Sequence, residues 1–286
     1  MKKTRPSCSL IAPIALGVCL TAAGLFPASA DTKYWEGLGA NNRWNSTNNF
    51  SPSVPASGDD LVFGAELRKV NKNNINNLSI QSITFTNGGF FIGPQTADPR
   101  LNLKVNNGMT VESAVVGNNA WQLWVVAGGS LGITNNSTDS TLQFVPSSSY
   151  TNEPRTMLDN VGFALTFAGA GNIAFNAEAA IRGAGGLTKL DSGTLTLLAT
   201  NTYSGPTLVA GGRLAMSTAH AGGGSISVNS GTTFEAVVGQ AGASLNCSSL
   251  TLGHLPGGSV TNAFDLDALT NFTAPIIYAT NLTTSG

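Results

Sequence analysis

The chain has 286 residues and carries 14 Lys and Arg against 15 Asp and Glu; charged residues make up only 10% of it, against roughly 25% in ordinary domains. No basic cluster stands out, which argues against nucleic-acid binding. Low charge with 34 glycines is typical of disorder, but 42% of the residues are apolar and recur in short strand-like bursts, so we expect an ordered β protein.

Residues 1–30 have the three parts of a secretory signal peptide. Lys2, Lys3 and Arg5 form a basic start, an apolar run spans Leu10 to Phe26, and Ala28-Ser29-Ala30 ends it with small residues. Cleavage after Ala30 would leave an exported chain, outside the cell or on its outer surface.

Two other interpretations of this segment are weaker. A membrane anchor needs roughly 20 apolar residues, and Pro13 interrupts this shorter run. A lipoprotein would use Cys19, but bulky Val18 precedes it.

The segment after the signal is close to neutral and poor in cysteine. Three of the 14 Lys and Arg lie in residues 1–30, which leaves 11 against 15 acids and a net charge of −4. Cys247 is then the single cysteine, which excludes an intramolecular disulfide or a cysteine-built metal site. No further apolar run is long enough to cross a membrane.

Residues 31–65 are rich in aromatic side chains, including Trp35, Trp44 and Phe50. We interpret this segment as an N-terminal cap, because the first coil of a repeat protein otherwise exposes its core and strand edges. The adjacent acids Asp59 and Asp60 could hold calcium or act on a glycoside, but a turn into a strand is the favoured interpretation.

Short alternating runs follow, among them Ser82–Phe85 and Leu101–Val105, and period two predicts strands. Helix signals are almost absent: Ala177–Arg182 is the best candidate, and glycines stop it after one turn. Gly128–Gly132 matches the Gly-x-Ser-x-Gly pattern of a nucleophile elbow. No helix signal follows it, as an elbow requires, so we expect a corner.

The clearest periodicity starts with Gly193–Leu197. Its Leu195 is echoed by Leu214, Phe234 and Leu252 at nearly equal spacings. A repeat of about 20 residues built from short strands is typical of a solenoid. We therefore predict an all-β fold, a right-handed parallel β-helix over residues 66–286, with a β-sandwich as the alternative. The length of the chain after residue 30 would make roughly a dozen coils. Asparagine-rich corners are expected to form side-chain ladders along its axis that satisfy backbone groups at the turns.

The segment 183–217 also carries a family resemblance. It contains Gly-Gly-Leu-Thr-Lys at 185–189, Gly-Thr-Leu-Thr-Leu at 193–197, Asn-Thr-Tyr-Ser-Gly-Pro-Thr at 201–207 and Gly-Gly-Arg-Leu at 211–214. This order resembles the autotransporter-associated β-strand repeat, although Asp191 and Pro206 stand where glycine is common. The resemblance covers this one segment and implies a bacterial surface or secreted passenger with a β-helical body, but no particular reaction.

Autotransporters end in a membrane β-barrel, for which this chain leaves no room. We therefore expect a truncated gene product or another export route.

Several residues have side chains or positions suited to chemistry. The glycines at 183–186 hint at a phosphate loop, but a strand follows where phosphate binding needs a helix, so we expect a corner. His220, in a flexible surface turn, and His254 have no partner at metal-ligand spacing. Asp265 and Asp267 form a second acidic pair with only a weak claim to metal binding or catalysis.

The strongest enzymatic alternative is a polysaccharide lyase, since Arg182, Lys189, Asp191 and Arg213 lie near one another in sequence and could project outward. An ice-binding threonine array would begin at Thr194 and Thr196, but Arg213 and Ala215 interrupt it one coil later.

We expect a structural or adhesive protein that is not an enzyme, with no catalytic, cofactor-binding or metal-ligating residue. Its expected partner is a surface polysaccharide or the surface of a host or neighbouring cell, with a carbohydrate-active β-helix enzyme as the alternative.

Overall fold

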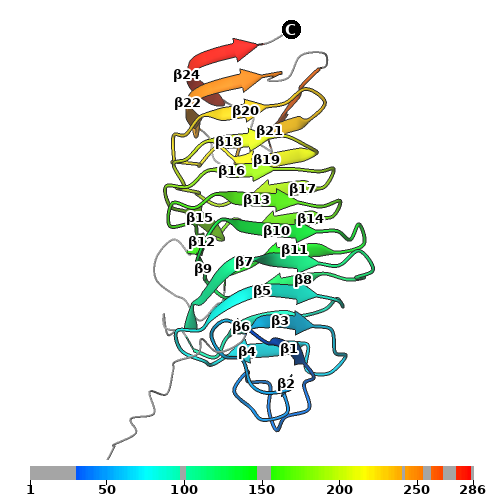
Figure 1. Ribbon diagram of the computed structural model, residues 1–286. Helices are drawn as coiled ribbons and strands as arrows, with labels where there is room; N and C mark the ends of the chain where they lie inside the picture. The colour runs from blue at the N-terminus through cyan, green and yellow to red at the C-terminus, as the bar shows by residue number, and fades with distance from the viewer. Residues whose placement is uncertain are drawn as a thin grey trace, which may run out of the picture.

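A computed structural model describes residues 30–96, 101–146, 156–239, 242–253, 259–266 and 275–284. Within these ranges the regular elements are strands and no α-helix is present. The strands stack in sequence order along one axis, so that the chain forms a parallel β-helix (Figure 1). Parallel pairing throughout the body excludes the β-sandwich alternative, whose sheets are antiparallel.

One face of the β-helix, called here the long sheet, runs the full length of the molecule. Its main path contains, from bottom to top in Figure 1, β1 (Thr32–Trp35), β3 (Asp60–Phe63), β5 (Ser79–Phe85), β7 (Leu103–Val111), β10 (Leu131–Asn135), β13 (Leu165–Ala168), β16 (Leu187–Lys189), β18 (Thr207–Val209), β20 (Ile226–Val228), β22 (Leu245–Leu252) and β24 (Ile277–Thr284).

The opposing sheet has nine strands: β4 (Val70–Asn73), β6 (Phe91–Pro94), β8 (Asn119–Trp121), β11 (Thr141–Phe144), β14 (Asn172–Phe175), β17 (Thr194–Leu197), β19 (Arg213–Ser217), β21 (Thr233–Val237) and β23 (Thr261–Asp265). A side branch joins the long sheet through β7 and contains β9 (Val125–Ala127), β12 (Thr156–Asp159) and β15 (Ala180–Arg182).

The core consists of columns in which each coil places an apolar side chain over that of the coil before. In the opposing sheet one column runs Ile92, Trp121, Phe144, Phe175, Leu197, Met216, Ala236 and Phe264. The rings of Phe144 and Phe175 stack with centroids 4.1 Å apart. Burying such columns is the main favourable term for a fold in which one coil cannot bury its own apolar face.

At the N-terminal end, β2 (Phe50–Ser51) adds to β1 as an antiparallel strand. Trp35, Trp44 and Phe50 pack against Phe63, with ring centroids at 6.2, 5.8 and 6.0 Å respectively, and Trp44 is completely buried. Aromatic side chains thus close this end of the core.

The strand register corrects the expected repeat in one place. Leu195, Leu214 and Phe234 lie above one another in the opposing sheet, as the periodicity predicts. The next residue in that column is Asn262, which follows after a longer step along the chain. Leu252 instead pairs with Val228 in the long sheet, because the chain after β21 forms β22 on the long sheet before it returns to the opposing sheet.

Two other local expectations also differ from the structure. The helical candidate at Ala177–Arg182 is a turn followed by β15, because Ile181 is needed in the core. Leu101–Val105 becomes part of a longer strand that begins at Leu103.

Candidate functional site

The four residues considered for a lyase do not converge on one outer face. Arg182 lies on β15 in the side branch, whereas Arg213 lies on β19 in the opposing sheet. Asp191 occupies a left-handed turn conformation with a φ of 55°, and its carboxylate accepts a hydrogen bond from the Gly169 N–H at 2.9 Å.

Lys189 corrects the expectation of an outward side chain, because only 2% of it is exposed. It occupies a core column between Phe167 and Val209. Its ammonium donates to the carbonyl oxygens of Leu190, Asp191 (2.9 Å) and Gly211 (3.4 Å). Burial lowers the pKa of Lys189 to about 8, and the charge of Asp191 opposes the fall. The alkyl part of the Lys189 side chain packs in the core column, and its ammonium group binds carbonyl oxygens of two turns. Lys189 is therefore unsuited to act as the base for a substrate on the outer face.

Arg213 is engaged with a neighbouring strand. Its guanidinium donates to the Glu235 carboxylate on β21, with Nε 3.1 Å from Oε2. The register also places Arg213 over Thr194 and Ala215 over Thr196, so the threonine array is interrupted where the sequence indicated.

The side branch gathers a cluster that the sequence did not reveal, formed by Trp124, Asp159 and Arg182. The Arg182 Nε donates to Asp159 Oδ2 at 2.9 Å, and its guanidinium carbon lies 4.6 Å from the centre of the Trp124 ring. The Arg182 side chain remains 44% exposed. The ring carries an indole N–H that is buried and without a hydrogen-bond partner among the described residues.

Strand register brings these three residues together from three separate coils. Arg182 pairs with Asp159, which pairs with Val126, and Trp124 lies just before that position on the chain. No local sequence motif marks this cluster. An aromatic residue and an acidic residue at nearby positions of successive coils, as Trp124 and Asp159 are, would have been the pattern with which to predict it.

His220 corrects another expectation, since it lies in no exposed turn. Only 4% of it is exposed, and its ring centre is 4.8 Å from that of Tyr203. Burial lowers its pKa to about 4, so the imidazole is neutral near pH 7. Burial also raises the pKa of the Tyr203 hydroxyl, which bonds Thr207 Oγ1 at 2.9 Å. The pair belongs to the core.

Of the two acidic pairs, Asp59 and Asp60 are both described by the structure, whereas Asp267 of the second pair is not. Asp59 is buried, and its carboxylate accepts hydrogen bonds from the backbone N–H groups of Asp31 (3.1 Å) and Ala56 (2.8 Å). Asp60 accepts from the Ser82 hydroxyl at 2.5 Å. Both acids therefore serve the turn and the strand entry. Asp267 and His254 lie outside the described residues.

The two glycine-rich matches are corners. Ser130 is exposed and β10 follows at once, so the elbow geometry is not formed. Gly183 has a φ of 113°. At Gly185 an added Cβ would lie 1.8 Å from the Phe163 carbonyl oxygen. Glycine is therefore required at this position, because the backbones of two successive coils lie so close together there.

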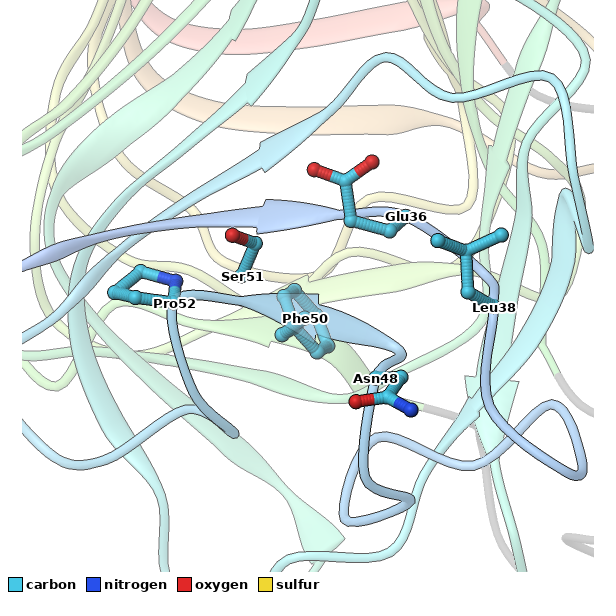
Figure 2. A pocket seen from close by; sticks show the side chains of 6 residues that line it. All are labelled: Glu36, Leu38, Asn48, Phe50, Ser51 and Pro52. Carbon is cyan, nitrogen blue, oxygen red and sulfur yellow. The ribbon is translucent and has the colours of Figure 1, made fainter.

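An open depression of about 340 Å³ lies on the N-terminal end beside β2. Figure 2 shows its lining side chains, Glu36, Leu38, Asn48, Phe50, Ser51 and Pro52. Glu36 is the single charged group among them, and the Phe50 ring belongs to the core at 3% exposure. The depression presents no pair of groups suited to acid–base chemistry.

The part of the chain that the structure describes holds no candidate metal centre, because no group of three His, Cys, Asp or Glu side chains there is placed to bind an ion. Nor does this part contain a helix with the length and apolar character needed to cross a bilayer. Cys247 is a buried free thiol, and burial raises its pKa.

Comparison with known families matches residues 187–216 to the passenger-associated-transport-repeat. This match lies inside the 183–217 segment and covers β16 to β19. It confirms the resemblance to autotransporter-associated repeats and suggests an exported, passenger-type protein. No curated protein and no solved structure matches the chain significantly.

Proposed function

We propose that this chain, which carries a passenger-associated-transport repeat, is an exported surface protein whose β-helix has a structural or adhesive role rather than a catalytic one. The repeat supports export, since it is named for the transport of passengers. The composition of residues 1–30 supports a secretory signal cleaved after Ala30.

The observation that carries the proposal is the use of the repeat's own residues. Leu187, Leu195 and Leu214 fill the core, and Lys189 ties turn carbonyls together. Asn201 accepts a hydrogen bond from the Ile181 N–H of the coil before. The most specific segment of the chain thus serves stacking, as a scaffold requires.

The Trp124–Asp159–Arg182 cluster is the surface that we propose for contact with a polysaccharide. An indole ring supplies apolar area, while a half-exposed guanidinium and a carboxylate supply donors and acceptors. Hydroxyl-rich polymers present both kinds of surface. Contact of this type requires no bond cleavage.

The test measures binding and cleavage together. The purified exported chain is mixed with neutral and acidic polysaccharides, and binding is followed by calorimetry while unsaturated products are followed by absorbance. We expect binding without product. Arg182→Ala should weaken binding roughly tenfold, because it removes a charged hydrogen bond and the contact with the indole ring. Arg213→Ala, which removes a similarly exposed arginine from another sheet, should leave binding unchanged.

Product formation would contradict the non-catalytic role, and equal effects of the two arginine variants would contradict the assigned surface. The N-terminal residue of the exported chain provides a separate check. Asp31 is expected, and a chain retained in the cell with residues 1–30 intact would contradict export.

A further inference from the structure

The backbone nitrogen of Asp31 lies against a buried carboxylate. The Asp31 N–H donates to Asp59 Oδ1 at 3.1 Å, and only 3% of Asp59 is exposed. The carbonyl oxygen of Asp31 accepts from the Asp60 N–H at 2.9 Å. The backbone of Asp31 is thus held through both its nitrogen and its carbonyl oxygen, so the position of the nitrogen beside Asp59 is well defined.

The Asp59 carboxylate is oriented by its other contacts. Its Oδ2 accepts from the Ala56 N–H at 2.8 Å, while Oδ1 faces the Asp31 nitrogen. The Lys33 ammonium lies 3.0 Å from Asp31 Oδ2 and 3.8 Å from Asp59 Oδ2. These three side chains carry two negative charges and one positive charge. One more positive charge beside Asp59 would make the group neutral, and buried charges are stable when they are paired.

The sequence places a processing site at the same nitrogen. Residues 28–30, Ala-Ser-Ala, have the small-residue pattern of a signal cleavage site, and the bond to be cut joins Ala30 to Asp31. Both of these residues are exposed, as access by a protease requires. The cleavage pattern and the contact with Asp59 are independent observations, and they concern the same atom.

We propose that cleavage after Ala30 creates an α-ammonium group at Asp31 that forms an ion pair with the buried Asp59 carboxylate. Hydrolysis by a signal peptidase adds one water molecule across the Ala30–Asp31 bond. The Ala30 carbonyl carbon becomes part of a carboxylate, and the Asp31 nitrogen takes up the released proton. The hydrogen bond to Asp59 then joins two charged groups, and such a bond is stronger than one from a neutral amide.

The consequence is an N-terminal cap that is completed in the processed chain. β1 starts at Thr32 and pairs with β2 and β3, so the ion pair fixes the start of the first strand of the long sheet. The unprocessed chain has a neutral amide at this position. The processed chain should therefore be the more stable of the two, by an amount that depends on Asp59. This inference rests on the export and cleavage proposed above.

Two chains with defined first residues test the ion pair. One starts at Asp31, and the other retains residues 28–30, which move the free amine away from Asp59. Urea unfolding of both chains is the measurement. The equilibrium constant for unfolding should be roughly five- to tenfold larger for the longer chain, because a charged hydrogen bond is replaced by a neutral one.

A pair of acidic variants assigns this difference to one carboxylate. Asp59→Asn should remove the difference in unfolding constant between the two chains. Asp60→Asn is the matched control, because the Asp60 carboxylate bonds the Ser82 hydroxyl on β5 instead, and the difference should persist in it.

The reactivity of the amine provides a second measurement, which needs no variant. A paired ammonium is a poor nucleophile, so the α-amine of the chain that starts at Asp31 should react several-fold more slowly with an amine-reactive ester than that of the longer chain. Peptide mapping by mass spectrometry separates the α-amine from the lysines.

The possible failures are distinguishable. Equal unfolding constants of the two wild-type chains, a difference that persists in Asp59→Asn, or equal labelling rates would overturn the ion pair alone. A first residue other than Asp31 in the exported chain would instead contradict the proposed cleavage, and the ion pair with it.

Discussion

Two lysines occupy the same inward-facing column of the long sheet, at its first strand and in the repeat. Lys33 pairs with Leu61 in register, and its ammonium lies 3.0 Å from Asp31 and 3.8 Å from Asp59. Lys189 meets backbone carbonyls instead. A buried charge is tolerated where partners satisfy it, and each lysine satisfies this condition differently. Sequence patterns assign both to the surface because Lys is rarely buried.

His220 gives the clearest pH dependence. Its pKa falls from 6.5 to about 4 on folding, so the unfolded chain binds a proton between these values that the folded chain does not. The free energy of unfolding should therefore fall as pH drops from 6.5 to 4, by up to about 1.4 kcal/mol per pH unit from this group.

Urea unfolding of the wild type and of His220→Gln over this pH range measures the effect. The carboxylates titrate in both proteins, so the difference between them reports the imidazole alone. The free energy of unfolding should fall more steeply with decreasing pH in the wild type than in the variant. Parallel pH profiles would show that the imidazole is not held neutral by the fold.

Among the strands and their connections, buried asparagines fix the corners where one coil turns into the next. These side chains bind backbone groups at the turns, as expected, and several of the bonds reach the neighbouring coil. An amide both donates and accepts, so one side chain can satisfy an N–H and a C=O of a turn. The completely buried members are Asn49, Asn71, Asn73, Asn119, Asn135, Asn160 and Asn201.

Asn160 is the best example to test. Its Nδ2 donates to the Gly185 carbonyl at 2.9 Å, and its Oδ1 accepts from the N–H groups of Gly185 and Gly162, both at 3.0 Å. Asn160→Ala should lower the free energy of unfolding by about 2 to 3 kcal/mol, because buried backbone groups lose their partners.

Denaturant unfolding is the measurement. Asn107→Ala is the control, since Asn107 makes an exposed side-chain contact with Gln81, and it should cost no more than about 0.5 kcal/mol. A similar cost for both variants would contradict the corner role of Asn160.

Along the full β-helix, stacking makes every internal coil depend on its two neighbours, and the ends must be treated separately. Coil length is not constant: the coil from Leu195 to Leu214 is much shorter than the coil from Leu131 to Leu165. The pairs β10–β13 and β17–β19 keep a continuous register despite this variation, whereas β5–β7 and β12–β15 each contain one register shift. The cross-section is therefore maintained while the outer connections change.

The N-terminal cap should contribute to the stability of the stack. Trp44 is completely buried, and its indole N–H donates to Asn71 Oδ1 at 2.8 Å. Trp44→Ala should lower the free energy of unfolding by roughly 3 to 5 kcal/mol, the usual cost of emptying a large aromatic site. Leu38→Ala removes an exposed side chain nearby and should cost far less.

Both variants are compared by urea unfolding of the same exported chain. If Trp44→Ala lowers the free energy of unfolding no more than Leu38→Ala does, the aromatic segment does not close the core in the way described.

Local signals along the chain were sufficient to establish the fold class and the repeat. Alternation of period two, turn residues at the corners and the echo from Leu195 to Leu214 and Phe234 are such signals, and each coil repeats them because each coil solves the same burial problem. The order of motifs in 183–217 was enough for the family resemblance.

The remaining features emerged only in the folded molecule. Leu252 lies on the other sheet, because the lengths of irregular connections carry no periodic signal. Lys189 and His220 are buried, since burial depends on the coils above and below. Trp124 meets Arg182 through register across β9, β12 and β15. In a solenoid, residues far apart in sequence become neighbours by stacking, and stacking register is a property of the whole fold.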